Sequence, residues 1–270
     1  MSSALELLDR ECILAGLTAT AQSVLSRLEL FPTLDSTNAY LQAGARDHWP
    51  SGAVCLAEQQ SAGRGRLGRS WLTPFGASLA LSLLWRFNLP PEKLSGLSLA
   101  TGIAVARTLQ AFGVSNVGLK WPNDVWWRKR KLGGILLDSG SDAGVFHVVA
   151  GIGLNVNLPS HTGELIDQPW VDLQEILATP VISRNRLAAN LINELIETFI
   201  GFEQGGFADL AGEWARFDVI TGQRVQLQML NRTITGIARG VNITGALLLE
   251  TESGEIKPYI GGEISLRVQS

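Results

Sequence analysis

The sequence predicts an α/β (α+β) fold in two parts: an α/β domain over residues 27–219 and a small β-barrel domain over residues 220–270. Strand-like alternation and helix-like periodicity interchange throughout the first part. After Thr221-Gly222 only short β-type segments occur, separated by turn residues, which is typical of a small closed barrel. Hydrophobic residues make up 46% of the chain and charged residues 17%, so a sizeable core is expected.

Composition argues against several classes of protein. The net charge of -3 and the pI of about 5.7 disfavour a dedicated nucleic-acid binder, although a local cationic pocket stays open. Cys12 and Cys55 show neither metal-ligand spacing nor a disulfide framework, and the three histidines are scattered singly. Charges at Glu6–Glu11 would interrupt a signal peptide, and no uncharged apolar run reaches membrane-spanning length. A cytoplasmic protein with no membrane partner is therefore expected.

The chain begins with a leader segment, residues 1–26, which is too short to form a domain. Leu5, Leu8 and Cys12 have helical spacing, and Gly16 is expected to end that helix. A short strand is then expected over Arg27–Thr33.

The next stretch combines a helix start with polar side chains. Asp35 or Ser36 is a suitable N-cap for a helix that runs to about Arg46. The hydroxyl and amide groups here either cap the helix or face the polar head of a ligand, and the local pattern favours capping. A buried strand is expected over Gly52–Gln60.

Strand Ser78–Arg86 is predicted by clean alternation. Large apolar residues occupy one face and mostly small residues the other, which leaves room for a ligand or a packed helix. Pro91–Phe112 is predicted as a helix that ends at Gly113. The remaining strands of the first part are expected at Val117–Trp121, Val125–Trp127, Leu132–Ser139 and Val145–Asn157, and helices at Leu173–Leu177, Ser183–Phe202 and Phe207–Phe217.

The barrel strands are expected to be short. Turn residues such as Asn231, Asn242 and Gly245 separate them. Their predicted ranges are Val225–Met229, Thr233–Arg239, Ala246–Glu250, Ile256–Tyr259 and Ile264–Val268.

Gly63–Arg69 is the most unusual stretch, with three glycines and three arginines in seven residues. Glycine lets a backbone approach a ligand closely, and the arginine fork suits carboxylate and phosphate. The spacing fits neither common phosphate-loop pattern. An anion clamp is therefore only slightly favoured over a solvated basic turn.

Three further stretches carry polar groups at strand ends. Lys120–Asp124 brings a cation, an amide and a carboxylate to one sheet edge, and Lys131 precedes a pair of glycines. Asn155 and Asn157 are expected on the same strand face. Each stretch is weak evidence alone, because a single lysine is usually solvated and an aspartate such as Asp124 is more often a turn residue than a metal ligand.

Taken together and in order, these motifs resemble the biotin–protein ligase family, also called biotin–[acetyl-CoA-carboxylase] ligase. The resemblance runs from about Leu28 to Arg267 and includes Lys257-Pro258-Tyr259 and the segment Gly261–Arg267. The motifs that carry it are Asp35-Ser36-Thr37-Asn38, Gln60-x-x-Gly-Arg-Gly-Arg-x-Gly-Arg-x-Trp71, Lys120-Trp121-Pro122-Asn123-Asp124, Lys131-Leu132-x-Gly134-Ile135 and Gly151-x-Gly153-x-Asn155-x-Asn157.

The resemblance implies a mixed-sheet catalytic domain, an SH3-like barrel and a two-step reaction that modifies another protein. Biotin and Mg·ATP would give biotinyl-5′-adenylate, which a lysine of the biotin carboxyl carrier domain of acetyl-CoA carboxylase then attacks. The implied catalytic residues are Arg64, Arg66 and Lys131, which can neutralise the carboxylate and the phosphate and stabilise the transition state between them.

The resemblance also implies binding residues. Biotin's ureido group needs neutral donors and acceptors, which Ser, Thr and Gln provide. The implied biotin contacts are Ser36, Thr37, Asn38, Gln60, Gly63, Arg64, Gly65, Arg66, Lys131, Gly134 and Gly153. The implied contacts to ATP or the adenylate are Arg66, Arg69, Trp71, Lys120, Asn123, Asp124, Lys131, Asn155 and Trp170, with Asp124 as the expected Mg²⁺ ligand.

One departure from the family pattern concerns the N-terminus. Bifunctional members carry a winged helix-turn-helix domain, and this chain begins where that domain would have ended, so neither repression nor DNA binding is expected. A homodimer stays open. The nearest alternative is a lipoate–protein ligase, against which the loop Gly63–Arg69 and the barrel both argue. A more remote alternative is an RNA-binding module, which the acidic pI disfavours.

Overall fold

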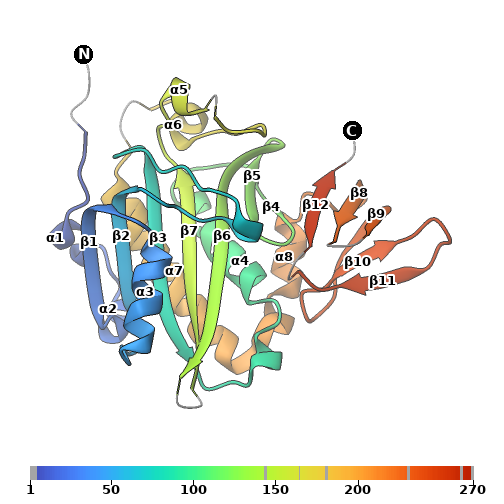
Figure 1. Cartoon of the computed structure of the whole chain (residues 1–270), viewed down its shortest axis with the longest axis horizontal. Coiled ribbons are helices and arrows are strands. Elements are labelled where there is room, and N and C mark those ends of the chain that lie inside the picture. The colour runs from blue at the N-terminus through green and yellow to red at the C-terminus, as the bar shows by residue number, and fades with distance from the viewer. Residues whose placement is uncertain are drawn as a thin grey trace.

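The computed structural model describes residues 5–142, 145–163, 165–179, 182–229, 232–261 and 264–268. Within these residues the chain forms a seven-stranded sheet flanked by helices and a separate five-stranded antiparallel sheet near the C-terminus (Figure 1). The predicted α/β fold class with a C-terminal antiparallel β sheet is therefore confirmed, and the domain boundary at residues 219 and 220 stays a prediction. None of the described helices is both long and apolar enough to cross a membrane.

The larger sheet is mixed. Its strand order is β1-β2-β3-β7-β6-β5-β4, in which β1 and β2 are parallel and the other neighbours antiparallel. The C-terminal ends of β1, β2 and β7 therefore meet at one edge, where β3 begins. The bounds are β1 (Arg27–Leu34), β2 (Ala53–Gln60), β3 (Ser78–Phe87), β4 (Val117–Lys120), β5 (Asp124–Trp127), β6 (Arg130–Asp142) and β7 (Val145–Asn155).

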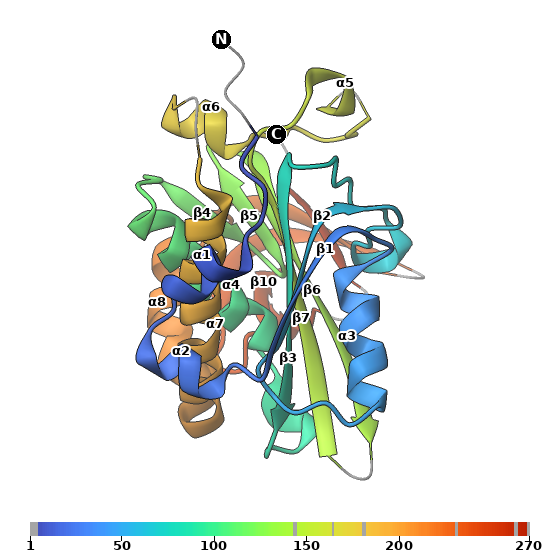
Figure 2. The same ribbon diagram turned by 90° about the vertical axis from the view of Figure 1, so that its left-hand side faces the viewer.

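Helices cover both faces of this sheet, with α3 (Thr37–Arg46) on one face and α4 (Leu97–Ala111) and α7 (Arg184–Gly205) on the other (Figure 2). The short helices α1 (Arg10–Ala15) and α2 (Ala19–Val24) pack against α7. Ile13, Leu17 and Ala21 thereby join the same buried cluster as the sheet. The remaining helices are α5 (Ser160–Gly163), α6 (Leu173–Leu177) and α8 (Ala211–Phe217).

Strand β3 shows why the two faces differ. Leu79, Leu81 and Leu83 pack into the large cluster beneath α4 and α7, as the alternation predicted. On the opposite face the small side chain of Ala80 leaves space beside the N-terminus of α3, where Ser82 hydrogen-bonds to Thr37 and Asn38. That space becomes part of the cavity described below.

Several predicted helices have different bounds in the structure. The first helix begins at Arg10 instead of Leu5, because the Asp9 side chain caps it by accepting a hydrogen bond from the Cys12 amide. The helix expected over Pro91–Phe112 breaks at Gly96, whose φ of 84° reverses the chain. Phe207–Phe217 similarly divides into a 3-10 turn, Gly206–Leu210, followed by α8.

The C-terminal sheet has the strand order β11-β10-β9-β8-β12, and each of the five predicted strands is present. Among the described residues its pairing runs from β11 to β12 without joining these two strands. Asn231, Gly262 and Glu263, which the sequence singled out, lie outside the described residues. The bounds are β8 (Arg224–Gln228), β9 (Thr233–Val241), β10 (Leu247–Glu250), β11 (Ile256–Tyr259) and β12 (Ser265–Val268).

The two sheets share one hydrophobic core. Leu247 and Leu249 belong to the same buried cluster as α4 and β3. The indole Nε1 of Trp121 donates to the Gly245 carbonyl at 3.1 Å, which fixes the β4–β5 turn against the C-terminal sheet. The polar residues of that turn are consequently held by both parts of the chain.

Candidate active site

A cavity of about 810 Å³ opens at the edge where β1, β2 and β7 end. The β4–β5 turn, the loop Gly63–Arg69 and β12 complete its walls. It collects almost every site residue that the sequence singled out: Ser36, Thr37, Asn38, Gln60, Arg64, Gly65, Arg66, Arg69, Trp71, Lys120, Asn123, Asp124, Lys131, Gly134, Gly153, Asn155 and Trp170.

One end of the cavity is neutral and already hydrogen-bonded. Ser36 caps α3 and accepts from the Ala39 amide, so the capping prediction is confirmed. The next residue, Thr37, donates through its backbone amide to Gln60 Oε1 at 2.9 Å. Its hydroxyl lies 3.1 Å from the same oxygen and 2.7 Å from Ser82 Oγ. Capping and facing the cavity are therefore compatible roles for this helix start.

Glycines form the floor of the cavity, and they make room for protein side chains. A Cβ added at Gly151 would lie 2.1 Å from Asn38 Oδ1, and one at Gly153 would lie 2.4 Å from the Trp71 indole. Both distances are far below van der Waals contact. The Gly-x-Gly pattern of β7 thus lets Asn38 and Trp71 lie flat on the sheet.

The other end of the cavity is charged. Asp124 bridges two lysines, with Oδ1 at 2.7 Å from Lys131 Nζ and Oδ2 at 3.5 Å from Lys120 Nζ. Burial alone would raise the pKa of Asp124, but the ammonium groups of Lys131 and Lys120 outweigh it and hold this pKa below its usual value. Burial lowers the pKa of Lys120, although Asp124 opposes that shift.

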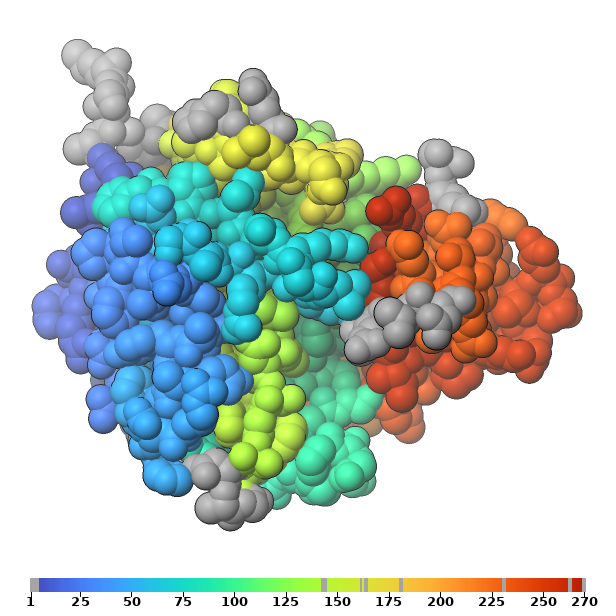
Figure 3. All heavy atoms as spheres, in the orientation of Figure 1, coloured from blue at the N-terminus to red at the C-terminus, as the bar shows by residue number. Residues whose placement is uncertain are grey.

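The loop Gly63–Arg69 closes the cavity between these two ends. Arg64 pairs with Asp138 on β6 at 2.7 Å, whereas Arg66 donates to Asn123 Oδ1 at 2.8 Å and to the Ile264 carbonyl at 3.0 Å. Figure 3 shows this segment, in cyan, reaching the C-terminal domain in orange and red. The loop therefore contacts both the seven-stranded sheet and the C-terminal domain.

Backbone pairing beside Lys131 completes the charged end. The Lys131 amide donates to the Pro169 carbonyl, and the Val171 amide donates to the Lys131 carbonyl, both at 2.9 Å. This brings Trp170 to the wall of the cavity. Asn155 lies beneath, donating to the Val171 carbonyl at 3.1 Å.

A few sequence expectations differ from the observed positions. Gly63 does not line the main cavity but a neighbouring one of about 520 Å³ between the loop and β6. Asn157 lies beyond the end of β7 and is exposed, because the strand ends at Asn155, so the two asparagines do not share the cavity. Roles assigned to single residues in binding or catalysis stay predictions.

Sequence reasoning also missed several residues of the site. Lys129 reaches the cavity from the β5–β6 turn, where it and Arg128 adopt positive φ angles of 64° and 47°. Asp138 lies seven residues beyond Lys131, and its relevance to the site is recognisable only from its contacts with Arg64 and Asn38. The segment 165–169 carried no local motif, and the segment Gly261–Arg267, although part of the resemblance, was not assigned to the site. From these two regions and Val268 come the lining residues Leu165, Ile166, Asp167, Gln168, Pro169, Ser265, Leu266, Arg267 and Val268.

The described residues contain no cluster of three or more His, Cys, Asp or Glu side chains that could hold a metal ion by themselves. Among the residues that the structure describes, Asp124 and Asp167 are the carboxylates that line the cavity. Magnesium in nucleotide enzymes commonly takes one or two carboxylates together with substrate phosphates. The donor set therefore fits a magnesium ion that arrives with a nucleotide, and it does not form a closed site of its own.

Comparison with known proteins gives matches over nearly the whole chain. Residues 30–155 match the biotin/lipoate A/B protein ligase family, and residues 220–267 match the biotin protein ligase C-terminal domain. The bifunctional ligase/repressor BirA of Escherichia coli is 42% identical over 264 residues, which cover 97% of this chain and 79% of that protein. The biotin–[acetyl-CoA-carboxylase] ligase of Mycobacterium tuberculosis is 34% identical, with 89% and 90% covered.

A solved structure agrees with these sequence matches. The biotin protein ligase of Aquifex aeolicus in complex with biotin and ATP superposes with a TM-score of 0.77 at 30% identity, covering 91% of this chain and 100% of that one. The expected SH3-like nature of the C-terminal domain agrees with the second family match. The motifs, the fold and these relatives together show that the chain belongs to the biotin protein ligase family.

Proposed function

We propose that this protein is an ATP-dependent biotin–protein ligase that forms biotinyl-5′-adenylate and transfers biotin to a lysine of a carrier protein. The observation that carries the proposal is the single cavity with a neutral end at Thr37 and Gln60 and a cationic end at Lys120 and Lys131. Relatives named as biotin ligases, one solved with biotin and ATP, support this choice of substrates.

In the first step, biotin and ATP react in this cavity. The ureido head binds at the neutral end, where Ser36, Thr37 and Gln60 offer hydroxyl and amide groups. A carboxylate oxygen of biotin attacks the α-phosphorus, the bond to the bridging oxygen breaks, and pyrophosphate leaves. Because two anions must approach each other, Lys131 and the loop arginines stabilise the charge that develops between them.

In the second step, the carrier's lysine amine attacks the carbonyl carbon of the adenylate. The bond from that carbon to the phosphate oxygen breaks, AMP leaves, and the amine loses a proton. The cavity must keep the mixed anhydride until the carrier arrives. The loop Gly63–Arg69, most of whose residues line the cavity, is the segment to which we assign this role.

ATP enters this scheme with magnesium, which neutralises phosphate charge when bound. Asp124 is the carboxylate that would hold the ion, with Asp167 as a second oxygen donor on the wall. Because both oxygens of Asp124 face lysine ammonium groups, the lysines would turn toward the phosphates as the nucleotide enters. The carrier is proposed to be the biotin carboxyl carrier domain of acetyl-CoA carboxylase, and the setting the cytoplasm. A homodimer and the absence of DNA binding remain predictions.

The test is intact-mass spectrometry of a carrier domain incubated with the protein, Mg·ATP and either biotin or lipoate. We expect a mass gain with biotin and none with lipoate. A gain with lipoate alone would establish the alternative ligase activity. RNA binding is disfavoured by the acidic pI of about 5.7, and a filter-binding assay whose signal fell steeply with salt would revive it.

A further inference from the structure

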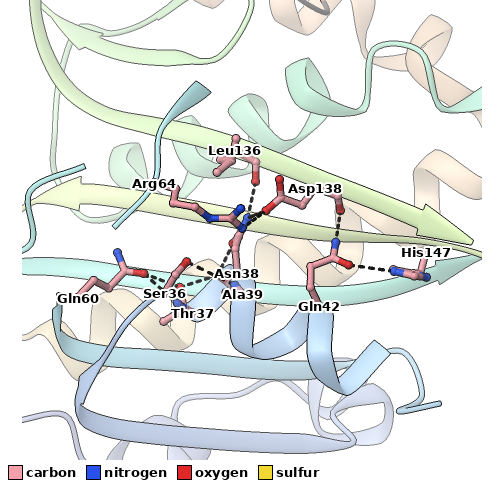
Figure 4. Close-up of polar contacts among 11 residues, drawn as sticks. Ser36, Thr37, Asn38, Ala39, Gln42, Gln60, Arg64, Leu136, Asp138 and His147 are labelled. Atoms are coloured by element: carbon pink, nitrogen blue, oxygen red, sulfur yellow. Dashed lines mark hydrogen bonds and ion pairs between the residues drawn. The ribbon is translucent and has the colours of Figure 1, made fainter. Parts of the chain in front are cut away.

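One carboxylate outside the sequence motifs connects the loop to the pocket. Asp138 Oδ2, on β6, accepts from Arg64 NH2 at 2.7 Å and from Asn38 Nδ2 at 3.0 Å (Figure 4). Arg64 belongs to the loop, whereas Asn38 lies in the first turn of α3 on the cavity wall. A single oxygen atom thus joins the glycine-rich loop to the neutral end of the cavity.

The backbone of Asp138 is itself held in place by a hydrogen bond from α3. Gln42, one turn further along α3, donates through Nε2 to the Asp138 carbonyl at 2.9 Å. Its Oε1 lies 3.2 Å from Nε2 of the buried His147 on β7 (Figure 4). Asn38 is held equally well, because its Oδ1 lies 2.6 Å from Ser82 Oγ and its Nδ2 also donates to the Leu136 carbonyl. The carboxylate is therefore presented to Arg64 in a defined position.

We propose that Asp138 is a positioning residue that latches the loop over the neutral end of the cavity and thereby sets how long the biotinyl ligand is retained. The inference rests on the proposed function for the identity of the ligand. Arg66 ties the other side of the loop to Asn123 and the C-terminal domain, so Asp138 supplies the attachment on the side of Thr37 and Gln60. Loss of it should release one side of the loop only.

Asp138 is expected to affect the retention of the ligand and not the chemical step. Asp138 does not line the main cavity; it lines the smaller one beneath the loop. Its removal should therefore speed ligand release while leaving the charged end at Lys131 and Asp124 unchanged. Because the Arg64 side chain is 49% exposed and that of Asp138 26%, salt should weaken the latch.

The experiment compares Asp138→Asn with the wild-type protein. The variant keeps the shape and the acceptor for Asn38 but loses the negative charge opposite Arg64. We expect dissociation of biotin to be about three- to tenfold faster, between the effects of an exposed ion pair and of a charged hydrogen bond, with the rate of bound-state adenylation nearly unchanged. Trypsin should also cleave the ligand-free loop after Arg69 faster than in the wild-type protein.

Glu250→Gln is the matched control. Glu250 pairs with Arg239 in the C-terminal sheet, and the exposed fractions of the two side chains, 46% for Arg239 and 30% for Glu250, resemble those of the latch. This variant should keep wild-type dissociation and cleavage rates. Raising salt from low to high should speed biotin release in the wild-type and Glu250→Gln proteins more than in Asp138→Asn.

A double-mutant cycle with Arg64→Ala separates the latch from a general loss of structure. In the Arg64→Ala background, Asp138→Asn should produce little further change in release, because the partner is already gone. Wild-type release and cleavage rates in Asp138→Asn, or full additivity in the cycle, would overturn the proposal. Biotin release and loop cleavage are measured without the carrier protein. Failure of the wild-type protein to transfer biotin would therefore contradict the proposed function and not the role of Asp138.

Discussion

The neutral and the charged ends of the cavity are built in opposite ways. At the neutral end the residues Ser36, Thr37 and Asn38 are each only 4% exposed. Ser36 hydrogen-bonds to Ala39 on α3, Thr37 to Gln60 on β2, and Asn38 to Ser82 on β3. At the charged end Lys120 and Lys131 keep 12% and 14% exposure and share one carboxylate between them. The side chains at one end are held by hydrogen bonds within the protein before any ligand enters, whereas the other end holds more positive than negative charge.

This difference explains how one cavity can both recognise a neutral ring and stabilise the charge that develops during the reaction. A site that recognises a neutral ring by fixed hydrogen bonds is selective, because a ligand that leaves a buried donor or acceptor of the site unpaired binds more weakly. Approaching anions need charge that is present in advance and aimed at the transition state. Substitutions at the neutral end should therefore alter biotin affinity, whereas those at the charged end should alter the rate of adenylation.

The largest expected effect is that of Lys131→Ala at the charged end. Losing one charge-stabilising donor costs about 2.7–4 kcal/mol, or roughly 10²–10³-fold in rate. Asp124 would keep Lys120 as a partner, so the fold should survive. The measurement is biotin-dependent pyrophosphate release with circular dichroism as a check on folding.

Lys257→Ala is the control for that substitution, because Lys257 pairs with Glu255, its side chain is 49% exposed, and it is not among the lining residues of the cavity. It should leave pyrophosphate release unchanged. Release at the wild-type rate in folded Lys131→Ala would remove the distinction between the two ends.

Gly153→Ala tests the floor that both ends share. The added methyl group would meet the Trp71 indole at 2.4 Å, so the ring must move off β7. Overpacking of this kind costs about 1–3 kcal/mol, and we expect roughly 5- to 150-fold weaker binding of the adenylate. Gly201→Ala on α7, where the new Cβ meets nothing within 4 Å, should instead preserve binding and slightly stabilise the helix. Equal binding by the two variants would show that the position of Trp71 is unimportant.

Much of this architecture was predictable from the chain itself. The strands and most helices follow from alternation, helical periodicity and turn residues, which are local signals. The errors lie where tertiary contacts determine the bounds of an element. The helix predicted from Pro91 is interrupted at Gly96, because this glycine lies against Phe207 and leaves no space for a side chain. The capping signal at Asp9 was present but weaker than the apolar spacing that begins at Leu5.

The site was less accessible to sequence reasoning than the fold. Residues within motifs could be assigned through the family resemblance, and the structure brings nearly all of them together. Asp138 could not be found in this way, because its significance depends on Arg64, 74 positions earlier, and on Asn38, 100 positions earlier. Gly153 was expected to contact biotin; in the structure the Trp71 indole lies over it, and Asn38 lies over Gly151.

Thr37→Val probes the neutral end with a smaller effect. The hydroxyl contacts Gln60 and Ser82, both of which keep another partner when it is removed. A net hydrogen bond contributes about 0.5–1.5 kcal/mol, so the KM for biotin should rise roughly 2- to 13-fold while the KM for ATP stays constant. Thr198→Val is the control, because the buried Thr198 hydroxyl has no hydrogen-bond partner among the described residues. A change in the KM for ATP alone would reverse the assignment of the two ends.

The smallest effect concerns the pH dependence of the charged end. Burial lowers the pKa of Lys120, so its ammonium group should lose its proton at a lower pH than an ordinary lysine. Below that pKa the positive charge is present and attracts ATP; as the pH rises through it, the charge is lost and the KM for ATP should increase a few-fold. Lys120→Arg keeps its charge throughout this range and should flatten the profile. The KM for biotin should change in neither protein, since Thr37 and Gln60 do not titrate. If Lys120→Arg retains the wild-type alkaline rise, another group governs it, and the contrast between a titrating charged end and a pH-independent neutral end would have to rest on that group instead.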